Sequence, residues 1–325
     1  MTAIARRDLG RVLVTGAGGF LGAAVVRHLS EEGVTVIAAD VAGYAGMPAS
    51  TGSAPLEPCD VTDAAEVERL VGRSKISTLL HCGAVSGPMV LADQPARIVA
   101  INTMGTANVL EAARRAGVAR VVLCSTIDVY GSRQSGMVLE DAPLDPDTVY
   151  GASKAAAEQI LLAYRREHGL DAIALRLSWI YGPGRVTATA LEQLLRDGLS
   201  GRAARVDAHP AERTQYLHLD DAVRSLVCAA SVLKTERAVF NATAGPGSTF
   251  GAVAATVQAV LPALRVDLVG SPPTGASIDG YDQTAAANDI GFVPRMSFEA
   301  GIRAYVEALR TASTSPTPTA PVLLT

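Results

Sequence analysis

The sequence predicts an α/β protein built on a doubly wound parallel sheet, with helices on both faces. Residues 11–178 contain five near-continuous apolar runs, and a helical pattern lies between each run and the next. Continuous apolar strands indicate burial on both faces, as in parallel sheets covered by helices. A glycine-rich turn joins the first run to the first helical pattern. The predicted strands span 11–16, 34–40, 77–84, 120–126 and 171–178, with helices near 20–32, 64–73, 95–116 and 148–168.

The second half of the chain is less regular. Its helical patterns lie near 187–198, 220–232, 250–261 and 297–310. We interpret it as a smaller C-terminal lobe from which some segments return to the main sheet. The expected organisation is a main domain over 1–177 joined by 214–243, a substrate-binding lobe over 178–213 and 244–310, and a Ser/Thr/Pro-rich disordered tail over 311–325.

The composition excludes several classes of function. Hydrophobic residues make up 49% and charged residues 18% of the 325 positions, as in a globular protein with a substantial core. The net charge of -4 provides no basic surface for a nucleic-acid backbone. No apolar run approaches the ~18 residues of a membrane span, and residues 1–10 lack a signal-peptide core. We therefore expect a cytoplasmic protein without nucleic-acid or membrane partners.

The four cysteines are expected to be buried, reduced thiols. Cys59, Cys82, Cys124 and Cys228 show no C-x-x-C spacing, and the five histidines are scattered. Because a zinc site needs clustered ligands, no metal is predicted.

The segment VLVTGAGGFLG places three glycines between the first predicted strand and the first helix. Gly16, Gly19 and Gly22 follow the spacing G-x-x-G-x-x-G. Such glycines permit a tight turn and let backbone N–H groups approach a pyrophosphate at the positive end of a helix. Phe20 and Leu21 then dock the helix onto the sheet. The pattern predicts a dinucleotide site to which Gly16, Gly19, Phe20 and Leu21 contribute.

The second predicted strand ends at Asp40, 24 residues after Gly16. A carboxylate there can accept hydrogen bonds from both ribose hydroxyls of an adenosine, and it would repel a 2′-phosphate. Because no arginine adjoins it, the expected cofactor is NAD rather than NADP. Asp60 and Val61 could hold the adenine ring, although a plain surface loop explains Asp60 almost as well.

A tyrosine and a lysine four residues apart share one face of a predicted helix. Tyr150 is a poor base at neutral pH, because tyrosine titrates near ~10 in water. The ammonium of Lys154, one of three lysines in the chain, favours the phenolate, as does an oxidised nicotinamide. Thr126, at the carboxyl end of its strand, can bind the same substrate oxygen. These residues predict a proton relay in which Tyr150 and Lys154 also contact the cofactor.

Several motifs follow one another in a fixed order: TGAGGFLG, Asp40, NTMGTANVLEAAR (102–114), STIDVYG, YGASK, LRLSWIYGPG (175–184) and RTQYLHLDD (213–221). Together they resemble the extended short-chain dehydrogenase/reductase family, also called the NAD-dependent epimerase/dehydratase family. The resemblance runs from about residue 10 to about residue 310. It implies a Rossmann-type fold and chemistry based on hydride transfer.

The resemblance also implies roles for individual residues. Thr126, Tyr150 and Lys154 correspond to the catalytic trio, and Asn102 to a residue that supports the site. The segment after Arg176 and the stretch around Arg213 are expected to meet the substrate. Relatives often form homodimers through the helices that lie here at about 95–116 and 148–168.

Two departures from the family pattern reduce the number of reactions and substrates to be considered. Sugar-nucleotide 4,6-dehydratases carry Thr-Asp-Glu at the strand end, whereas this chain has Thr126, Ile127 and Asp128. Isoleucine cannot protonate a leaving hydroxyl, so dehydration is disfavoured. Asp128 either contacts the substrate or hydrogen-bonds the following turn. Trp179 stands where nucleotide-sugar epimerases usually have an asparagine, and it either stacks on a sugar ring or packs structurally.

Three further residues are candidates for substrate binding. Ser86 lies where a substrate loop should leave the sheet. Arg213 could bind a phosphate or a carboxylate bidentately, or pair structurally with Asp220 or Asp221. Arg185, after YGPG, is a weaker candidate for anion binding.

These observations favour an NAD-dependent epimerase that acts on a carbohydrate-type hydroxyl through a transient keto intermediate. The alternative is an NAD-dependent dehydrogenase of a free sugar, sugar acid or polyol, from which NADH must leave. Loss of the asparagine favours a substrate without a nucleotide. A dinucleotide-sensing protein without turnover is disfavoured, because binding alone does not require the Thr126, Tyr150 and Lys154 relay.

Overall fold

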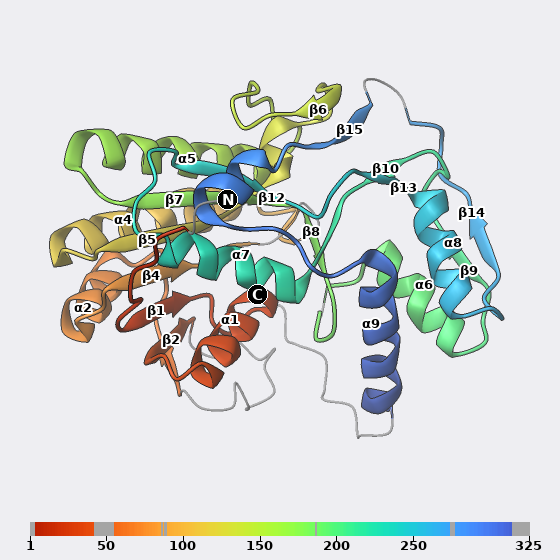
Figure 1. Cartoon of the computed structure of the whole chain (residues 1–325), viewed down its shortest axis with the longest axis horizontal. Coiled ribbons are helices and arrows are strands. Elements are labelled where there is room, and N and C mark those ends of the chain that lie inside the picture. The colour runs from red at the N-terminus through yellow and green to blue at the C-terminus, as the bar shows by residue number, and fades with distance from the viewer. Residues whose placement is uncertain are drawn as a thin grey trace.

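The computed structural model describes residues 4–41, 55–85, 87, 90–185, 187–273 and 277–313. Its centre is a seven-stranded sheet with the order β12-β7-β5-β4-β1-β2-β3, in which every neighbouring pair is parallel (Figure 1). The doubly wound prediction is confirmed. The strands are β1 Val12–Thr15, β2 Val36–Asp40, β3 Leu56–Pro58, β4 Thr78–His81, β5 Arg120–Thr126, β7 Ala172–Leu177 and β12 Val239–Ala242.

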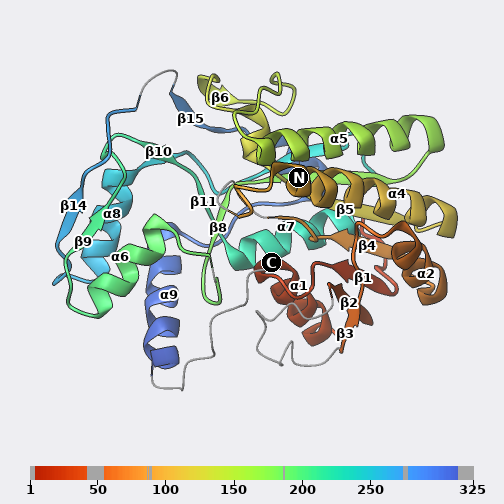
Figure 2. The same ribbon diagram turned by 180° about the vertical axis from the view of Figure 1, so that it is seen from behind.

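Helices cover both faces of this sheet (Figures 1 and 2). Successive strand residues point to opposite faces. Val14 and Val122 therefore pack in the core beneath one helical layer, and Leu13 and Val121 in the core beneath the other. The first layer contains α1 Phe20–Glu31 and α7 Leu219–Ser231, and the second contains α2 Ala64–Ser74, α4 Gly105–Ala116 and α5 Val149–His168.

The predicted helix over 95–116 is continuous but not uniform. It consists of α3 Pro95–Val99, a π-helical turn over Ala100–Met104, and α4. Such turns interrupt the regular hydrogen bonding of a helix and are frequent at functional sites. This turn carries Asn102, whose side chain is fully buried.

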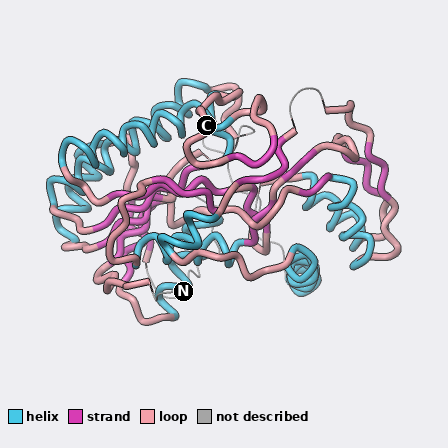
Figure 3. The backbone as a smooth tube through the Cα atoms, turned by 45° about the horizontal axis from the view of Figure 1, so that its top comes forward, coloured by secondary structure: helices cyan, strands magenta, loops and turns pink. Residues whose placement is uncertain are grey.

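A separate hydrophobic core, apart from those on the two faces of the sheet, lies beyond the carboxyl ends of the strands (Figures 1 and 3). It is formed by α6 Ala190–Leu199, α8 Phe250–Val260 and α9 Phe298–Ser313, with β9 Ala204–Val206 paired to β14 Val266–Leu268. Three further pairs of strands lie between the central sheet and this separate core. They are β8 Trp179–Tyr181 with β11 Tyr216–His218, β10 Arg213–Thr214 with β13 Ser248–Thr249, and β6 Gly136–Val138 with β15 Ile278–Tyr281.

The structure differs from the sequence prediction in detail. Within 214–243, α7 and β12 pack on the main sheet, whereas β11 pairs with β8 outside it. Residues 311–313, expected in a disordered tail, complete α9, and the rest of that tail lies outside the described residues. The exact domain boundaries stay a prediction. Among the described helices, none is long and apolar enough to cross a membrane.

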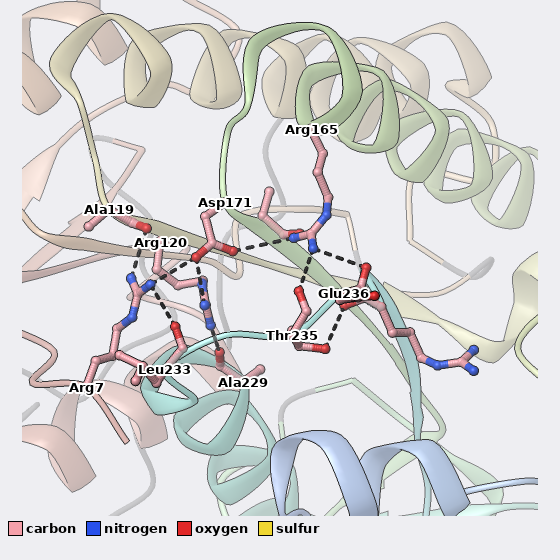
Figure 4. A network of polar contacts seen from close by, with 11 residues as sticks. Arg7, Ala119, Arg120, Arg165, Asp171, Ala229, Leu233, Thr235 and Glu236 are labelled. Carbon is pink, nitrogen blue, oxygen red and sulfur yellow. Dashed lines mark hydrogen bonds and ion pairs between the residues drawn. The ribbon is translucent and has the colours of Figure 1, made fainter. Parts of the chain in front are cut away.

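Three arginines converge on one carboxylate at the amino ends of β5 and β7 (Figure 4). Asp171 accepts hydrogen bonds from Arg7 and Arg120 at 2.9 and 2.8 Å, and lies 3.4 Å from Arg165. Carbonyl groups of six residues accept further hydrogen bonds from these arginines, so the cluster joins the N-terminal segment, β5, α5, β7 and the end of α7. These residues are Ala119, Ala172, Ala229, Leu233, Thr235 and Glu236.

The first prediction concerns this cluster. Asp171→Ala leaves the guanidinium of Arg120, which is 0% exposed, without its carboxylate. We expect the free energy of unfolding in urea to fall by about 2–3 kcal/mol, somewhat less than for a fully buried pair because Asp171 is itself partly exposed. The control is Glu299→Ala, which removes the exposed pair with Arg303 and should cost less than about 1 kcal/mol. Equal losses of unfolding free energy in the two variants would show that the buried cluster around Asp171 stabilises the fold no more than an exposed ion pair does.

Candidate active site

A cavity of about 200 Å³ opens at the carboxyl ends of β1, β4, β5 and β7. It lies where the strand order reverses between β1 and β4, the position at which open α/β sheets bind ligands. Its lining combines the glycine turn, the end of β5 and the first turns of α5. Of the residues predicted from the sequence, it includes Gly16, Gly19, Phe20, Leu21, Thr126, Asp128, Tyr150, Lys154, Trp179 and Arg185.

Close packing explains two of the three glycines. Gly16 has a φ of 68°, and a Cβ on it would lie 2.5 Å from the backbone nitrogen of Gly83. A Cβ on Gly22 would lie 2.0 Å from the carbonyl oxygen of Gly16. No side chain caps the N-terminus of α1 at Gly19, so its first N–H groups can face an anion. The turn therefore fits a pyrophosphate.

Asp40 lies at the carboxyl end of β2 and holds the glycine turn. One carboxylate oxygen accepts a hydrogen bond from the backbone N–H of Gly18 at 2.8 Å, and the other accepts one from Val41 at 2.8 Å. Each oxygen keeps a second lone pair with which it can bind a ribose hydroxyl. Burial raises the pKa of Asp40 despite these bonds, so a ligand that donates hydrogen bonds to the carboxylate would stabilise its charge.

Asp60 and Val61 have different surroundings. Asp60 is exposed and accepts hydrogen bonds from the backbone and the hydroxyl of Thr62, as in an ordinary turn. Val61 is buried, and its side chain packs so closely on Gly105 that a Cβ there would lie 2.8 Å away. Their contact with an adenine ring stays a prediction.

The structure brings the predicted relay together. Tyr150 and Lys154 lie on the first turns of α5, which begins after the N-cap Thr148, and they are 9% and 3% exposed. Burial and the charge of Asp128 raise the pKa of Tyr150, while hydrogen bonds with Thr126 and the backbone of Gly87 lower it. Burial lowers the pKa of Lys154. The enclosed relay therefore needs additional positive charge before it can hold a phenolate.

A buried ion pair that the sequence analysis did not identify fixes α5 on the sheet. Glu158 lies one turn beyond Lys154, on the same face of the helix, and is 0% exposed. It accepts hydrogen bonds from Arg176 of β7, the shortest at 2.7 Å, and another from Ser125 of β5. The spacing of four residues from Tyr150 to Lys154 to Glu158 was the signal that could have revealed it.

Asn102 supports the wall of the cavity. Its side-chain oxygen accepts a hydrogen bond from the backbone N–H of Val85 at 2.8 Å, and its amide donates to the carbonyl of Val85 at 3.3 Å. The same amide donates to the hydroxyl of Ser153, next to Lys154, at 3.0 Å. Asn102 therefore links the loop after β4 to α5. Ser86, the next residue in that loop, lies outside the described residues.

A second cavity, of about 400 Å³, adjoins the first on the side of the C-terminal lobe. Ile127, Asp128 and Trp179 line both cavities, so the two are neighbouring parts of one site. The rest of its lining mixes small apolar residues with polar and aromatic ones, among them Glu212, Arg213, Gln215, Tyr216 and Phe250.

Arg213 lines this second cavity, and its structural partner is not the one considered from the sequence. Its guanidinium donates to the carbonyl of Ile278 at 2.8 Å and lies 3.7 Å from the carboxylate of Asp279. Asp221 instead pairs with Arg224 and accepts hydrogen bonds from the backbone N–H groups of 295 and 296. The alternative pairing of Arg213 with Asp220 or Asp221 is therefore wrong.

Two buried polar atoms in the first cavity lack partners among the described residues: the hydroxyl of Ser178 and Nε of Arg185. Arg185 donates to the carbonyl of Ile180, and its guanidinium lies 5.8 Å from the ring centre of Phe20 in the glycine turn. Buried polar atoms usually have partners, so both residues are candidates for contact with a polar ligand. The rule that identified Thr126, a polar side chain at the carboxyl end of a strand, also applies to Ser178.

Comparisons with known proteins agree with this geometry. The NAD dependent epimerase/dehydratase family model matches residues 12–242. The dTDP-glucose 4,6-dehydratase of Streptomyces griseus is 31% identical over 311 residues, which cover 91% of this chain and 92% of that protein. The UDP-glucose 4-epimerase of Mycolicibacterium smegmatis is 29% identical and covers 93% of this chain and 99% of its own.

Solved structures of other proteins have a similar fold. The UDP-glucose 4-epimerase of Thermotoga maritima, determined with UDP-glucose, has a TM-score of 0.83 at 26% identity and covers 93% of this chain and 99% of its own. The dTDP-glucose 4,6-dehydratase DesIV of Streptomyces venezuelae, with NAD bound, has a TM-score of 0.80 at 27% identity and covers 94% and 98%. The chain belongs to the NAD-dependent epimerase/dehydratase family and is an NAD-dependent enzyme of the extended short-chain dehydrogenase type.

Proposed function

We propose that the protein is an NAD-dependent epimerase that inverts a hydroxyl-bearing carbon of a sugar through a transient ketone. The observation that carries this proposal is the meeting of Thr126, Tyr150 and Lys154 with the glycine turn in one cavity. Bound NAD supplies the acceptor and then the donor of the hydride. The protein itself provides proton transfer and orientation.

Each residue of the relay has a separate task. Tyr150 takes the proton of the substrate hydroxyl as the carbon is oxidised, and returns it when the ketone is reduced on its other face. Lys154 supplies positive charge beside the phenolate. Thr126 binds the same substrate oxygen and thereby directs its lone pair at Tyr150. Burial disfavours the phenolate until the cofactor adds its own positive charge, which ties proton transfer to an occupied cofactor site.

Dehydration is disfavoured by the side chain next to Thr126. Ile127 lines both cavities and has no proton to give to a leaving hydroxyl. Asp128 follows Ile127. The pattern of the 4,6-dehydratases has acidic side chains at both of these positions, whereas this chain has only one. Several relatives carry the name of dTDP-glucose 4,6-dehydratases. Ile127 departs from the Thr-Asp-Glu pattern that the sequence analysis gives for that class of enzyme.

The second cavity supports a sugar linked to a nucleoside diphosphate as the substrate. It adjoins the relay, and its lining offers the guanidinium of Arg213 for an anion and aromatic rings such as Tyr216 for a base. The relatives' names refer to UDP- and dTDP-sugars. This proposal replaces the expectation of a substrate without a nucleotide, which rested on Trp179 alone.

A dehydrogenase of a free sugar, sugar acid or polyol is the second candidate. It is favoured by Trp179, which lines both cavities where the related epimerases usually have an asparagine. A dehydrogenase would have to release NADH in every cycle, whereas an epimerase would not.

We also propose a homodimer formed through the helices over 95–116 and 148–168. Three large apolar side chains on these helices are exposed in the single chain: Val99, Met104 and Val149, at 42%, 55% and 42%. Burial of such residues against a second copy would remove them from water.

The carboxylate of Asp128 gives a pH-dependent prediction. Burial raises its pKa from 3.8 to about 6, so the folded state holds its proton more tightly than the unfolded state. Its contribution to stability is therefore full below about pH 4 and is lost as the pH rises through about 6. Asp128→Asn should raise the free energy of unfolding by on the order of 2 kcal/mol at pH 8, and by much less near pH 4.5.

Urea unfolding at both pH values measures this difference, and the exposed Asp93 supplies the control, because Asp93→Asn should change little at either pH. We expect Asp128→Asn to lose turnover while it gains stability, since the carboxylate faces both cavities. A loss of stability at pH 8 would show that the charge is compensated in the folded protein.

Substitution of Tyr150 tests the proposed reaction. Tyr150→Phe keeps the ring but removes the proton carrier, so turnover should fall by at least about 100-fold while the amount of bound NAD is unchanged. The assay follows the interconversion of UDP- and dTDP-linked sugars, and of free sugars, by chromatography without added cofactor.

Tyr164→Phe is the matched control, because Tyr164 lies on the same helix and its hydroxyl donates to Glu111 outside the cavity. Turnover by Tyr150→Phe at the wild-type rate would exclude Tyr150 from the mechanism. Accumulation of NADH with a free sugar, in the absence of any epimer, would favour the dehydrogenase.

A further inference from the structure

Two thiols face each other at the base of the cofactor cavity. β4 and β5 pair in parallel, with His81 opposite Leu123. The residues that follow these two in the sequence are Cys82 and Cys124. Their sulfur atoms lie 3.5 Å apart. Both are free cysteines, and both line the cavity that contains the glycine turn and Lys154.

The proposed reaction uses neither thiol. Hydrogen transfer requires Tyr150, Lys154 and Thr126 together with the cofactor, and two small apolar side chains could form this part of the wall equally well. Two thiols at this separation, open to a cavity, are arranged for joint oxidation, because little movement is needed to bring the sulfur atoms into bonding distance.

We propose that Cys82 and Cys124 form an oxidisable dithiol, a modification site through which peroxides control the binding of NAD. One thiol loses its proton and attacks hydrogen peroxide, which breaks the O–O bond and yields a sulfenic acid and water. The second thiol then attacks that sulfur and releases a second water. In total, two thiols and one peroxide give one disulfide and two waters.

The glycine turn connects this oxidation to the cofactor. A Cβ on Gly16 would lie 2.6 Å from the carbonyl carbon of Cys82, so the turn rests directly on the peptide between Cys82 and Gly83. Bond formation pulls Cys82 toward Cys124 and with it the peptide that supports the turn. Oxidation therefore weakens NAD binding. Bound NAD in turn would cover the cavity onto which both thiols open, and so slow their oxidation.

The chemistry of the pair sets its pH dependence. The neighbouring thiol of Cys124, burial and the charge of Asp40 raise the pKa of Cys82 well above its ordinary value, whereas the charge of Lys154 lowers it. Because the attacking species is the thiolate, oxidation should accelerate as the pH rises from 7 to 9.

The test treats the whole chain with hydrogen peroxide, once loaded with NAD and once depleted of it. Remaining thiols are alkylated in denaturant, and tryptic peptides are identified by mass spectrometry. The chain is suited to this mapping, because Cys82 and Cys124 fall in different peptides, residues 76–97 and 121–133, with no other cysteine in either. Bound NAD is quantified in parallel. Cys59 and Cys228 serve as internal references for general oxidation.

We expect the linked peptides to form at least about fivefold faster in the depleted protein, because both thiols are then open to the cavity. Oxidised protein should bind less NAD, and dithiothreitol should restore binding. Cys124→Ser cannot form the bond and should keep its NAD under the same peroxide.

The proposal is overturned if no linked peptide forms, if NAD gives no protection, or if Cys124→Ser loses NAD as readily as the wild type. None of these measurements uses turnover, so the dithiol and the proposed epimerase activity can fail independently.

Discussion

The buried ion pair between Glu158 and Arg176 is the interaction on which the geometry of the site depends. It fastens α5 to β7, and through Ser125 to β5, so the turns of α5 that carry Tyr150 and Lys154 cannot slide along the sheet. Arg176 also donates to the hydroxyl of Tyr130 at 2.7 Å, and Tyr130 donates to Asn241 of β12 at 2.6 Å. Separating these charges would leave one of them buried without compensation, so the helix has one strongly preferred position.

Burial would make the proposed relay dependent on its cofactor. Without a bound dinucleotide, the pKa of Tyr150 is raised and that of Lys154 is lowered, both of which oppose the charged forms needed for proton transfer. The same enclosure strengthens the electrostatic interactions of any charged group that enters the cavity, because little water is present to screen them. The enclosure therefore opposes both charged forms while the site is empty. Enclosure also suits the proposed epimerase, because a ketone formed in the cavity would be reduced again before it could escape into water.

Much of the fold and the position of the site could be predicted from the sequence. Continuous apolar strands and the glycine spacing are local patterns, and the rule that ligands bind at the carboxyl ends of strands placed Thr126, Tyr150 and Lys154 together. Contacts between segments distant in sequence were not predictable in this way. The Asp279 partner of Arg213 arrives from 66 residues away, and the pairing of Cys82 with Cys124 depends on the register of β4 and β5. The short strand β3 was missed because three residues carry no periodicity.

In the proposed reaction, hydride leaves and returns to the same substrate while NAD stays in the protein. Its most direct test is to denature the purified protein, prepared without added cofactor, and quantify the released NAD and NADH by chromatography. Retention through turnover predicts a nearly stoichiometric amount of cofactor per chain. Little or no cofactor, together with normal binding of added NAD, would show that the dinucleotide exchanges freely and would contradict the epimerase in favour of a dehydrogenase.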